Sequence, residues 1–261
     1  MRLEGKTAIV IGAGQSPGQG MGNGRATVLR FVQEGAHVLA VDRLLGLAQE
    51  TASMAGASCA AFAADVASEA ALAAAIAEGQ RLWGRIDILH YNVGVSIGGG
   101  DASPTEITEE AFDRICTLNL RGYVMACKHV LPVMRAQGSG VILAISSVAA
   151  YENYPYVAYK ATKVAMVETT RQLAIQNASY GIRANSILPG LMDTPMAVDT
   201  RARVSGKSRD EVARERDSRV PLRGKMGTAW DVANAALFLA SDEANFITGV
   251  ALAVDGGALA R

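Results

Sequence analysis

Tyr159 and Lys163 lie four residues apart in the segment YKATK, and together they could move a proton to or from a small molecule. Residues four apart share one face of a helix, so the phenol and the ammonium would lie side by side. A free tyrosine has a pKa of about 10, and a neighbouring cation favours the phenolate and lowers that pKa. The pair therefore predicts an acid/base site for an alcohol or carbonyl group.

A second pair with the same spacing, Tyr156 and Lys160, overlaps the first. Pro155 suits the start of a helix, which leaves Tyr156 at the boundary and places Tyr159 inside. We therefore assign the chemistry to Tyr159 and Lys163. The alternative is that Tyr159 is a half-buried aromatic residue and Lys163 a solvated charge, so the rest of the chain must decide.

Short apolar segments alternate with helical patterns along the whole chain. Strands are expected at residues 7–11, 37–41, 58–63, 86–91, 141–145, 182–188 and within 250–257. This alternation predicts the α/β class, with a doubly wound parallel sheet in one domain over residues 1–261. Ligands of such folds bind at the carboxyl ends of the strands. Residues 194–220 are polar and irregular for a strand, and we expect them to form a mobile helical lid there.

A glycine-rich loop, GAGQSPGQGMGNG, separates the first strand from the first helix. Free backbone N–H groups and the helix dipole make such a loop a site for the phosphates of a dinucleotide. Gly12 ends the strand and Gly24 opens the helix, so the close approach is assigned to Gly12, Gly22 and Gly24. Other glycines with a suitable spacing are Gly14, Gly18 and Gly20. The alternative is a flexible turn that binds nothing.

Asp42 follows the second strand, where a carboxylate would accept hydrogen bonds from the adenosine ribose and repel a 2′-phosphate. It favours NAD, although the adjacent Arg43 could meet such a phosphate. Small or polar residues also follow later strands: Asp65, Val66, Asn92, Val93, Gly94, Pro189, Gly190 and Thr194. Asn119 lies among apolar helical neighbours and needs hydrogen-bond partners. The alternative is that all of these are ordinary turn and core residues.

Composition narrows the class of partner. The chain has 261 residues, of which half are hydrophobic, and 25 Lys and Arg balance 25 Asp and Glu, so no charge excess indicates nucleic acid. Three cysteines without a CxxC spacing fit reduced thiols, and three histidines lack the spacing of metal ligands. No segment approaches the roughly 20 apolar residues of a membrane span. We expect a cytoplasmic protein that binds small molecules, and no metal, membrane or nucleic acid.

Together these motifs resemble those of the short-chain dehydrogenases/reductases, in the family's order and over nearly the whole chain. The matching segments are GNGRA at 22–26, DV at 65–66, NVG at 92–94, Asn119, ISS at 145–147, YKATK at 159–163, PGLMDT at 189–194 and VDGG at 254–257. The resemblance implies a seven-stranded Rossmann fold, a nicotinamide cofactor, hydride transfer at an alcohol or carbonyl carbon, and a homotetramer. The glycine loop is longer than the family's usual loop.

The resemblance also implies residue roles. Tyr159 would exchange the proton, Lys163 would hold the nicotinamide ribose and lower the pKa of Tyr159, and Asn119 would anchor a proton-relay water. A serine would orient the substrate oxygen: the strand alignment selects Ser147, which we prefer, and the usual spacing to the tyrosine selects Ser146. Cofactor contacts are implied for Gly12, Gly22, Asn23, Gly24, Asp42, Arg43, Asp65, Val66, Asn92, Val93, Gly94, Tyr159, Lys163, Pro189, Gly190 and Thr194.

The expected function is that of an NAD-dependent alcohol dehydrogenase or ketone reductase. One alternative is an NADPH-dependent ketoreductase, and another is a dinucleotide-binding regulator without turnover. The presence of the asparagine, serine, tyrosine and lysine together argues against the regulator, because binding alone does not require that set.

Overall fold

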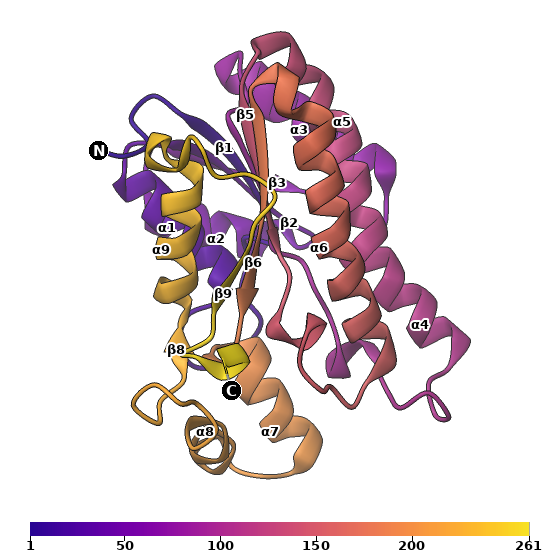
Figure 1. Ribbon diagram of the computed structural model, residues 1–261. Coiled ribbons are helices and arrows are strands. Elements are labelled where there is room, and N and C mark those ends of the chain that lie inside the picture. The colour runs from indigo at the N-terminus through magenta and orange to yellow at the C-terminus, as the bar shows by residue number, and fades with distance from the viewer. Residues whose placement is uncertain (261) are drawn as a thin grey trace.

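The computed structural model of the protein describes residues 1–260 and contains a parallel sheet of seven strands (Figure 1). The strands are β1 (Thr7–Ile11), β2 (His37–Asp42), β3 (Cys59–Ala63), β4 (Ile88–Tyr91), β5 (Gly140–Ile145), β6 (Ile182–Pro189) and β9 (Ala251–Val254). Their spatial order is β3-β2-β1-β4-β5-β6-β9. The predicted doubly wound α/β fold is confirmed, since the order reverses direction between β1 and β4.

The central strands are apolar throughout because helices cover both faces of the sheet. In β1, all five residues are buried. Ile9 and Ile11 belong to one hydrophobic core, while Ala8 and Val10 belong to a second core on the opposite face. This division follows from the alternation of side chains along a strand.

The helices form a layer on each face of the sheet (Figure 1). One layer contains α1 (Asn23–Gln33), α2 (Leu45–Ala55) and α9 (Ala229–Ala240). The other contains α3 (Glu69–Trp83), α4 (Glu109–Cys116), α5 (Gly122–Gln137) and α6 (Val157–Asn177). The long helix α6 follows β5 and carries Tyr159, Lys160 and Lys163, with Tyr156 as its N-cap residue. Its first turns meet the carboxyl ends of the strands.

Some boundaries differ from the sequence prediction. Strand β4 begins at Ile88 because the Asp87 carboxylate accepts the hydrogen bond from the Thr7 backbone N–H, at 2.9 Å. Strand β6 extends to Pro189, where it pairs with Val254 of β9. A two-stranded ladder of β7 (Met192–Asp193) and β8 (Gly227–Thr228) was not predicted.

That ladder joins the two ends of the segment that we expected to be a lid. The segment contains a π-helical turn, Pro195–Asp199, followed by α7 (Thr200–Ser205) and α8 (Arg209–Asp217). In Figure 1, α7 and α8 project beyond the sheet on the side where β6 ends. We call residues 195–217 the lid segment.

Candidate active site

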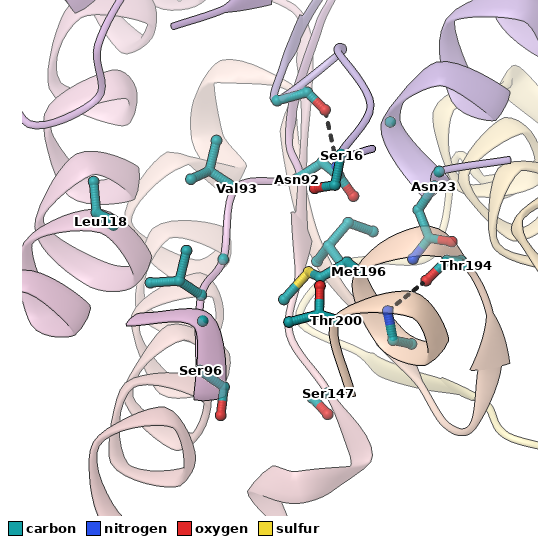
Figure 2. A pocket seen from close by; sticks show the side chains of 18 of the residues that line it. Ser16, Asn23, Asn92, Val93, Ser96, Leu118, Ser147, Thr194, Met196 and Thr200 are labelled. Carbon is teal, nitrogen blue, oxygen red and sulfur yellow. Dashed lines mark hydrogen bonds between the residues drawn. The ribbon is translucent and has the colours of Figure 1, made fainter. Parts of the chain in front are cut away.

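A cavity of about 850 Å³ lies at the carboxyl ends of the strands. Each of the sixteen residues that the resemblance assigned to the cofactor lines this cavity, and so does Ser147. Figure 2 shows Val93 and Ser96 on one side and Thr194, Met196 and Thr200 on the other. Of the predicted site residues, only Asn119 is not part of the lining.

The glycine loop packs closely against the end of β4. Gly12 has a φ of +83°, a backbone angle that residues with a side chain rarely adopt. Its carbonyl oxygen accepts a hydrogen bond of 2.9 Å from Asn92 Nδ2. A Cβ atom on Gly24 would lie 2.0 Å from that same oxygen. Glycine is therefore required at both positions, and the loops after β1 and β4 meet where the strand order reverses.

The residues around this loop fit a dinucleotide. Helix α1 begins after Gly22 without a side-chain cap, so its first N–H groups can face an anion. The buried Asn23 Oδ1 has no hydrogen-bond partner among residues 1–260. The Asp42 carboxylate lines the cavity and accepts hydrogen bonds from the backbone N–H groups of Gly14, at 3.0 Å, and Leu44, at 3.1 Å.

The additional length of the glycine loop reaches the lid segment. The backbone N–H of Gln19 donates to Asp199 Oδ1 at 3.2 Å, and the Arg203 guanidinium donates to the Pro17 carbonyl at 3.3 Å. The sequence could not indicate these contacts, because the partners lie 180 and 186 residues apart and no local pattern links them. The loop thus connects the cofactor side of the cavity with the lid segment.

Asp101 fixes the start of α6, which carries the predicted acid/base pair. Its carboxylate is 7% exposed and accepts hydrogen bonds of 3.0 Å from the backbone N–H groups of Ala158 and Tyr159. These donors have no partner inside the helix, so the carboxylate caps its first turn. The sequence analysis missed Asp101, because a cap 57 residues away leaves no local signal.

Tyr159 and Lys163 face the same cavity, with the lysine Nζ 5.5 Å from the centroid of the phenol ring. The lysine is 2% exposed and donates to the Ile145 carbonyl oxygen at 2.6 Å. It is therefore a buried amine and not the solvated charge of the alternative interpretation.

The pKa values of this pair differ from the expectation. Burial raises the pKa of Tyr159 to about 12, although a hydrogen bond with Ser147 acts to lower it. Burial lowers the pKa of Lys163 to about 7. We expected Lys163 to lower the pKa of the phenol. In the protein alone the pKa of the phenol is raised and not lowered, because burial is the largest effect on each group and Lys163 is not among the charges that shift the pKa of Tyr159.

The two candidate serines have different surroundings. Ser146 is 2% exposed, and its hydroxyl donates to the Lys163 carbonyl oxygen at 2.8 Å, which ties β5 to α6. The Ser147 hydroxyl accepts a hydrogen bond from the Ala149 N–H at 3.1 Å and also bonds with Tyr159. Of the two hydroxyls, the Ser147 hydroxyl is the one next to the phenol inside the cavity.

The second tyrosine and lysine pair has a structural role. The Lys160 ammonium donates to the carbonyl oxygens of Ala149, at 3.1 Å, and Glu152, at 2.6 Å, which fastens the loop before α6. Tyr156 is the N-cap residue of that helix and lines a smaller cavity of about 320 Å³. This arrangement separates Tyr156 from its lysine and from the main cavity.

Asn119 lies in a π-helical turn, Thr117–Arg121, and is fully buried. Its Oδ1 accepts from the Val95 N–H at 2.8 Å, and its Nδ2 donates to the Val95 carbonyl at 3.0 Å and to Thr162 Oγ1 at 3.1 Å. The amide thereby links the loop after β4 to α6. Both of its hydrogens are used, and its Oδ1 keeps one further lone pair as an acceptor.

Ser96 and Tyr154 form part of the wall of the cavity. The Ser96 hydroxyl is 3.1 Å from the Tyr154 hydroxyl and donates to Asp101 at 3.1 Å. The rings of Tyr154 and Tyr159 lie 5.5 Å apart. Two arginines of the lid segment, Arg201 and Arg216, also line the cavity.

Residues 1–260 contain no cluster of three or more His, Cys, Asp or Glu side chains arranged to hold a metal ion. None of the helices described is both long and apolar enough to cross a membrane.

The comparisons with known proteins agree with the fold. Residues 18–258 match the family model described as enoyl-(acyl carrier protein) reductase. The chain is 37% identical to 2-(R)-hydroxypropyl-CoM dehydrogenase of Xanthobacter autotrophicus, over 96% of this chain and 97% of that protein. It is 42% identical to a putative short-chain dehydrogenase/reductase from Burkholderia xenovorans, with a TM-score of 0.90 over 100% and 98% of the two chains. Levodione reductase is 31% identical, with a TM-score of 0.90 over 99% of each chain.

Proposed function

Because the chain belongs to the short-chain dehydrogenase/reductase family, we propose that it transfers a hydride between NAD and a secondary alcohol or its ketone, with Tyr159 as the acid/base. The family's oxidoreductases use a nicotinamide dinucleotide, and the relatives named above include a dehydrogenase and a reductase. The observation that carries the proposal is that one cavity is lined by the glycine loop, Asp42, Ser147, Tyr159 and Lys163.

The proton step is assigned to Tyr159. When bound, the cofactor supplies the hydride donor or acceptor and, when oxidised, a positive charge. With its pKa raised to about 12, the phenol is protonated at neutral pH and can donate to a carbonyl oxygen. In the direction of alcohol oxidation, positive charge beside the phenol favours its ionised form. Ser147, hydrogen-bonded to Tyr159, is assigned to hold the substrate oxygen in line with that proton.

Lys163 is assigned to the nicotinamide ribose as well as to the phenol. Its amine is buried, and beyond its bond to the Ile145 carbonyl and a weak contact of 4.0 Å with the Met166 sulfur it keeps a hydrogen for a ligand when it is protonated. Burial lowers its pKa to about 7, so a ligand oxygen that accepts a hydrogen bond from it would restore the ammonium form.

The preference for NAD rests on Asp42. Its carboxylate is anchored by Gly14 and Leu44 at the end of β2, where it faces the cavity. A 2′-phosphate placed there would meet a like charge at close range. The NADPH-dependent alternative is favoured by Arg43, which lines the same cavity and is exposed.

The experiment that tests the proposal is a screen for NAD and NADP reduction on secondary alcohols, sugars, hydroxysteroids and aryl carbinols, with the reverse reaction on the ketones. Turnover with NAD, faster than with NADP, supports it. A higher kcat/KM with NADP would select the alternative cofactor. Binding of either dinucleotide without turnover on any substrate would favour the regulator.

We extend the proposal to a lid role for residues 194–220 and to a cytoplasmic homotetramer. The lid segment contacts the glycine loop through Asp199 and Arg203, so its position can respond to the cofactor. Several large apolar side chains are exposed on the isolated chain, among them Ile175 at 76% and Val164 at 37% on α6. Such residues are typical of subunit interfaces. Light scattering on the purified protein measures the assembly directly.

A further inference from the structure

Two arginines of the lid segment lie between the main cavity and a smaller cavity beside it. Arg201 belongs to α7 and Arg216 to α8, and both line the main cavity of about 850 Å³. Together with Ile97 they also line the neighbouring cavity of about 320 Å³, so they form the boundary between the two spaces. Tyr159 and Ser147 line the main cavity and do not line the smaller one.

Neither arginine forms an ion pair in the part of the chain that the structure describes. Arg216 is 8% exposed, and its Nε lies 3.3 Å from the Met226 sulfur. Arg201 donates to the carbonyl oxygen of Ala197 at 2.9 Å. A thioether and a neutral carbonyl satisfy little of the hydrogen-bonding capacity of two guanidinium groups, each of which has five N–H donors.

Three other basic side chains in or near the lid segment have carboxylate partners. The pairs are Lys207 with Glu215, Arg209 with Asp193 and Asp199, and Lys225 with Asp217. These acids are therefore already engaged. Within residues 1–260 Arg203 also lacks a carboxylate partner, but it lines neither cavity and donates to the Pro17 carbonyl oxygen. What distinguishes Arg201 and Arg216 within the lid segment is that they line the main cavity without a carboxylate partner among the described residues.

The charge of Arg216 is unfavourable in the protein alone. Burial and the nearby charges of Arg201 and Arg219 lower its pKa to about 10, so it stays protonated at neutral pH. Asp193 acts in the opposite direction but is already paired with Arg209. A buried charge without a counterion costs stability, and such a cost is retained where the charge serves a ligand.

The arginines also lie close to the proton-transfer site. The charge of Arg201 favours the ionised forms of both Tyr154 and Tyr159. An anion between Arg201 and Arg216 would therefore be near the hydroxyl group that reacts. Glu152 also lines the cavity, but it is not among the charges that shift the pKa of Arg216, Tyr154 or Tyr159.

We propose that the substrate is an anionic secondary alcohol or ketone, whose carboxylate or similar oxyanion binds between Arg201 and Arg216 while its oxygen meets Tyr159 and Ser147. The inference rests on the proposed function for the reacting end of the substrate. Guanidinium groups bind planar carboxylates and phosphates through paired N–H donors, and both arginines reach the cavity from separate helices. The lid segment would then supply specificity, since it holds the counter-charge for the substrate.

Turnover on matched substrates tests the reacting complex. The probes are hydroxy acids with the hydroxyl and carboxylate separated by increasing numbers of carbons, each compared with its neutral amide and with a phosphate monoester of similar length. We expect kcat/KM to favour an oxyanion over the amide. Arg216→Met should lower kcat/KM for the acid by about tenfold or more and leave the amide within about twofold, since a hydrogen bond to a charged group is lost only with the acid.

Further variants separate charge from folding. Arg201→Met should have the same selective effect, and Arg216→Lys should retain part of the preference because the charge remains. Arg214→Met is the matched control, since Arg214 is exposed on the same helix and does not line either cavity. If Arg216→Met does not fold, the preference for the acid over the amide in Arg201→Met and Arg216→Lys still tests the inference. The inference is overturned if kcat/KM for the amide equals kcat/KM for the acid in wild type and this equality is unchanged in the variants.

A binding measurement distinguishes this inference from the proposed function. Calorimetry with butanoate and butanamide, without cofactor and with NAD, requires no turnover. Butanoate binding that is lost in Arg216→Met but kept in Arg214→Met supports the anion site even if no alcohol is oxidised, in which case only the proposed function fails. If neutral alcohols are oxidised but butanoate binds no more tightly than butanamide, the proposed function is retained and the anion site is rejected.

Discussion

The inner wall of the cavity and the lid segment are held by different kinds of contact. We define the inner wall as Gly12, Asn92, Ser147, Tyr159 and Lys163. Its hydrogen bonds join a buried or half-buried side chain to a backbone group at the end of a strand or the start of a helix. The lid segment depends largely on ion pairs between side chains that are partly exposed.

These contacts differ in strength. Exposed ion pairs contribute about 0–1 kcal/mol each, whereas leaving a buried donor or acceptor without its partner costs roughly 1–3 kcal/mol. The inner wall can therefore hold reacting atoms in one geometry, and the lid segment can change shape at small cost. The proposed chemistry would therefore depend on the inner wall, and the proposed choice of substrate on the lid segment.

The largest effect is expected for Tyr159→Phe, which keeps the ring and removes the proton that the reaction needs. Loss of a general acid/base typically lowers the rate by about 10²- to 10⁴-fold. Cofactor affinity and the circular dichroism spectrum should not change. The control is Tyr156→Phe, which should stay within a few-fold of wild type. An active Tyr159→Phe with an inactive, folded Tyr156→Phe would transfer the chemistry to the other tyrosine.

Lys163→Met should also abolish most activity and weaken cofactor binding, but it should stabilise the cofactor-free fold. The folded pKa of Lys163 is about 7 and its ordinary value is 10.5, so below pH 7 the fold must hold a buried ammonium. At this one group the unfolded chain binds more protons than the folded chain between pH 7 and 10.5, so the contribution of Lys163 to the stability of wild type rises with pH there.

Thermal unfolding measures this effect. The Tm advantage of Lys163→Met over wild type should be greatest at pH 7 and should shrink as the pH approaches 10. Tyr159 does not interfere in that window, because its raised pKa affects stability only between pH 10 and 12, where stability falls as the pH rises. A Tm difference that is constant from pH 7 to 10 would contradict the buried, neutral amine.

Ser147→Ala and Ser146→Ala test whether Ser147 contacts the substrate while Ser146 only stabilises the fold. Ser147→Ala should lower kcat by about 10²-fold, as expected when a donor to the reacting oxygen is lost. Ser146→Ala should keep kcat within a few-fold and lower Tm, because it removes the bond between β5 and α6. The reverse order of the two kcat values would show that Ser146 contacts the substrate.

Asp42→Asn should narrow the ratio of kcat/KM for NAD to that for NADP by about tenfold, because the charge is lost while an acceptor for Gly14 remains. Asp42→Ala should weaken both cofactors further, since the loop loses that anchor as well. Arg43→Ala is the companion variant: a marked loss of NADP activity there would show that Arg43 meets the phosphate. Wild type with a preference for NADP would refute the assignment of Asp42.

The smallest effect is expected where the lid segment contacts the glycine loop. Arg203→Met removes the exposed contact between the lid segment and the glycine loop and should raise the KM for the cofactor by about twofold, the effect of a weak surface interaction. Lys207→Met, in the same segment but paired with Glu215, is the control and should not change that KM. A tenfold increase for Arg203→Met would mean that the lid belongs to the cofactor site.

The sequence by itself determined the strands, their order along the chain and the residues at their carboxyl ends. Apolar runs, glycines with special backbone geometry and a tyrosine–lysine spacing on one helix are local signals, and each was visible in a short segment. This is why the doubly wound fold was predicted correctly, and why the sixteen residues assigned to the cofactor all line one cavity.

The tertiary structure alone decided features that depend on contacts between distant segments. Asp101 caps α6 from 57 residues away, and Asn119 uses both amide hydrogens on Val95 and Thr162. The pKa of Tyr159 rises instead of falling, because burial is a property of everything packed around a group and not of its nearest charged neighbour. Arg216 shows the same limit: its residue type was visible in the sequence, but its burial beside the cavity without a carboxylate was not.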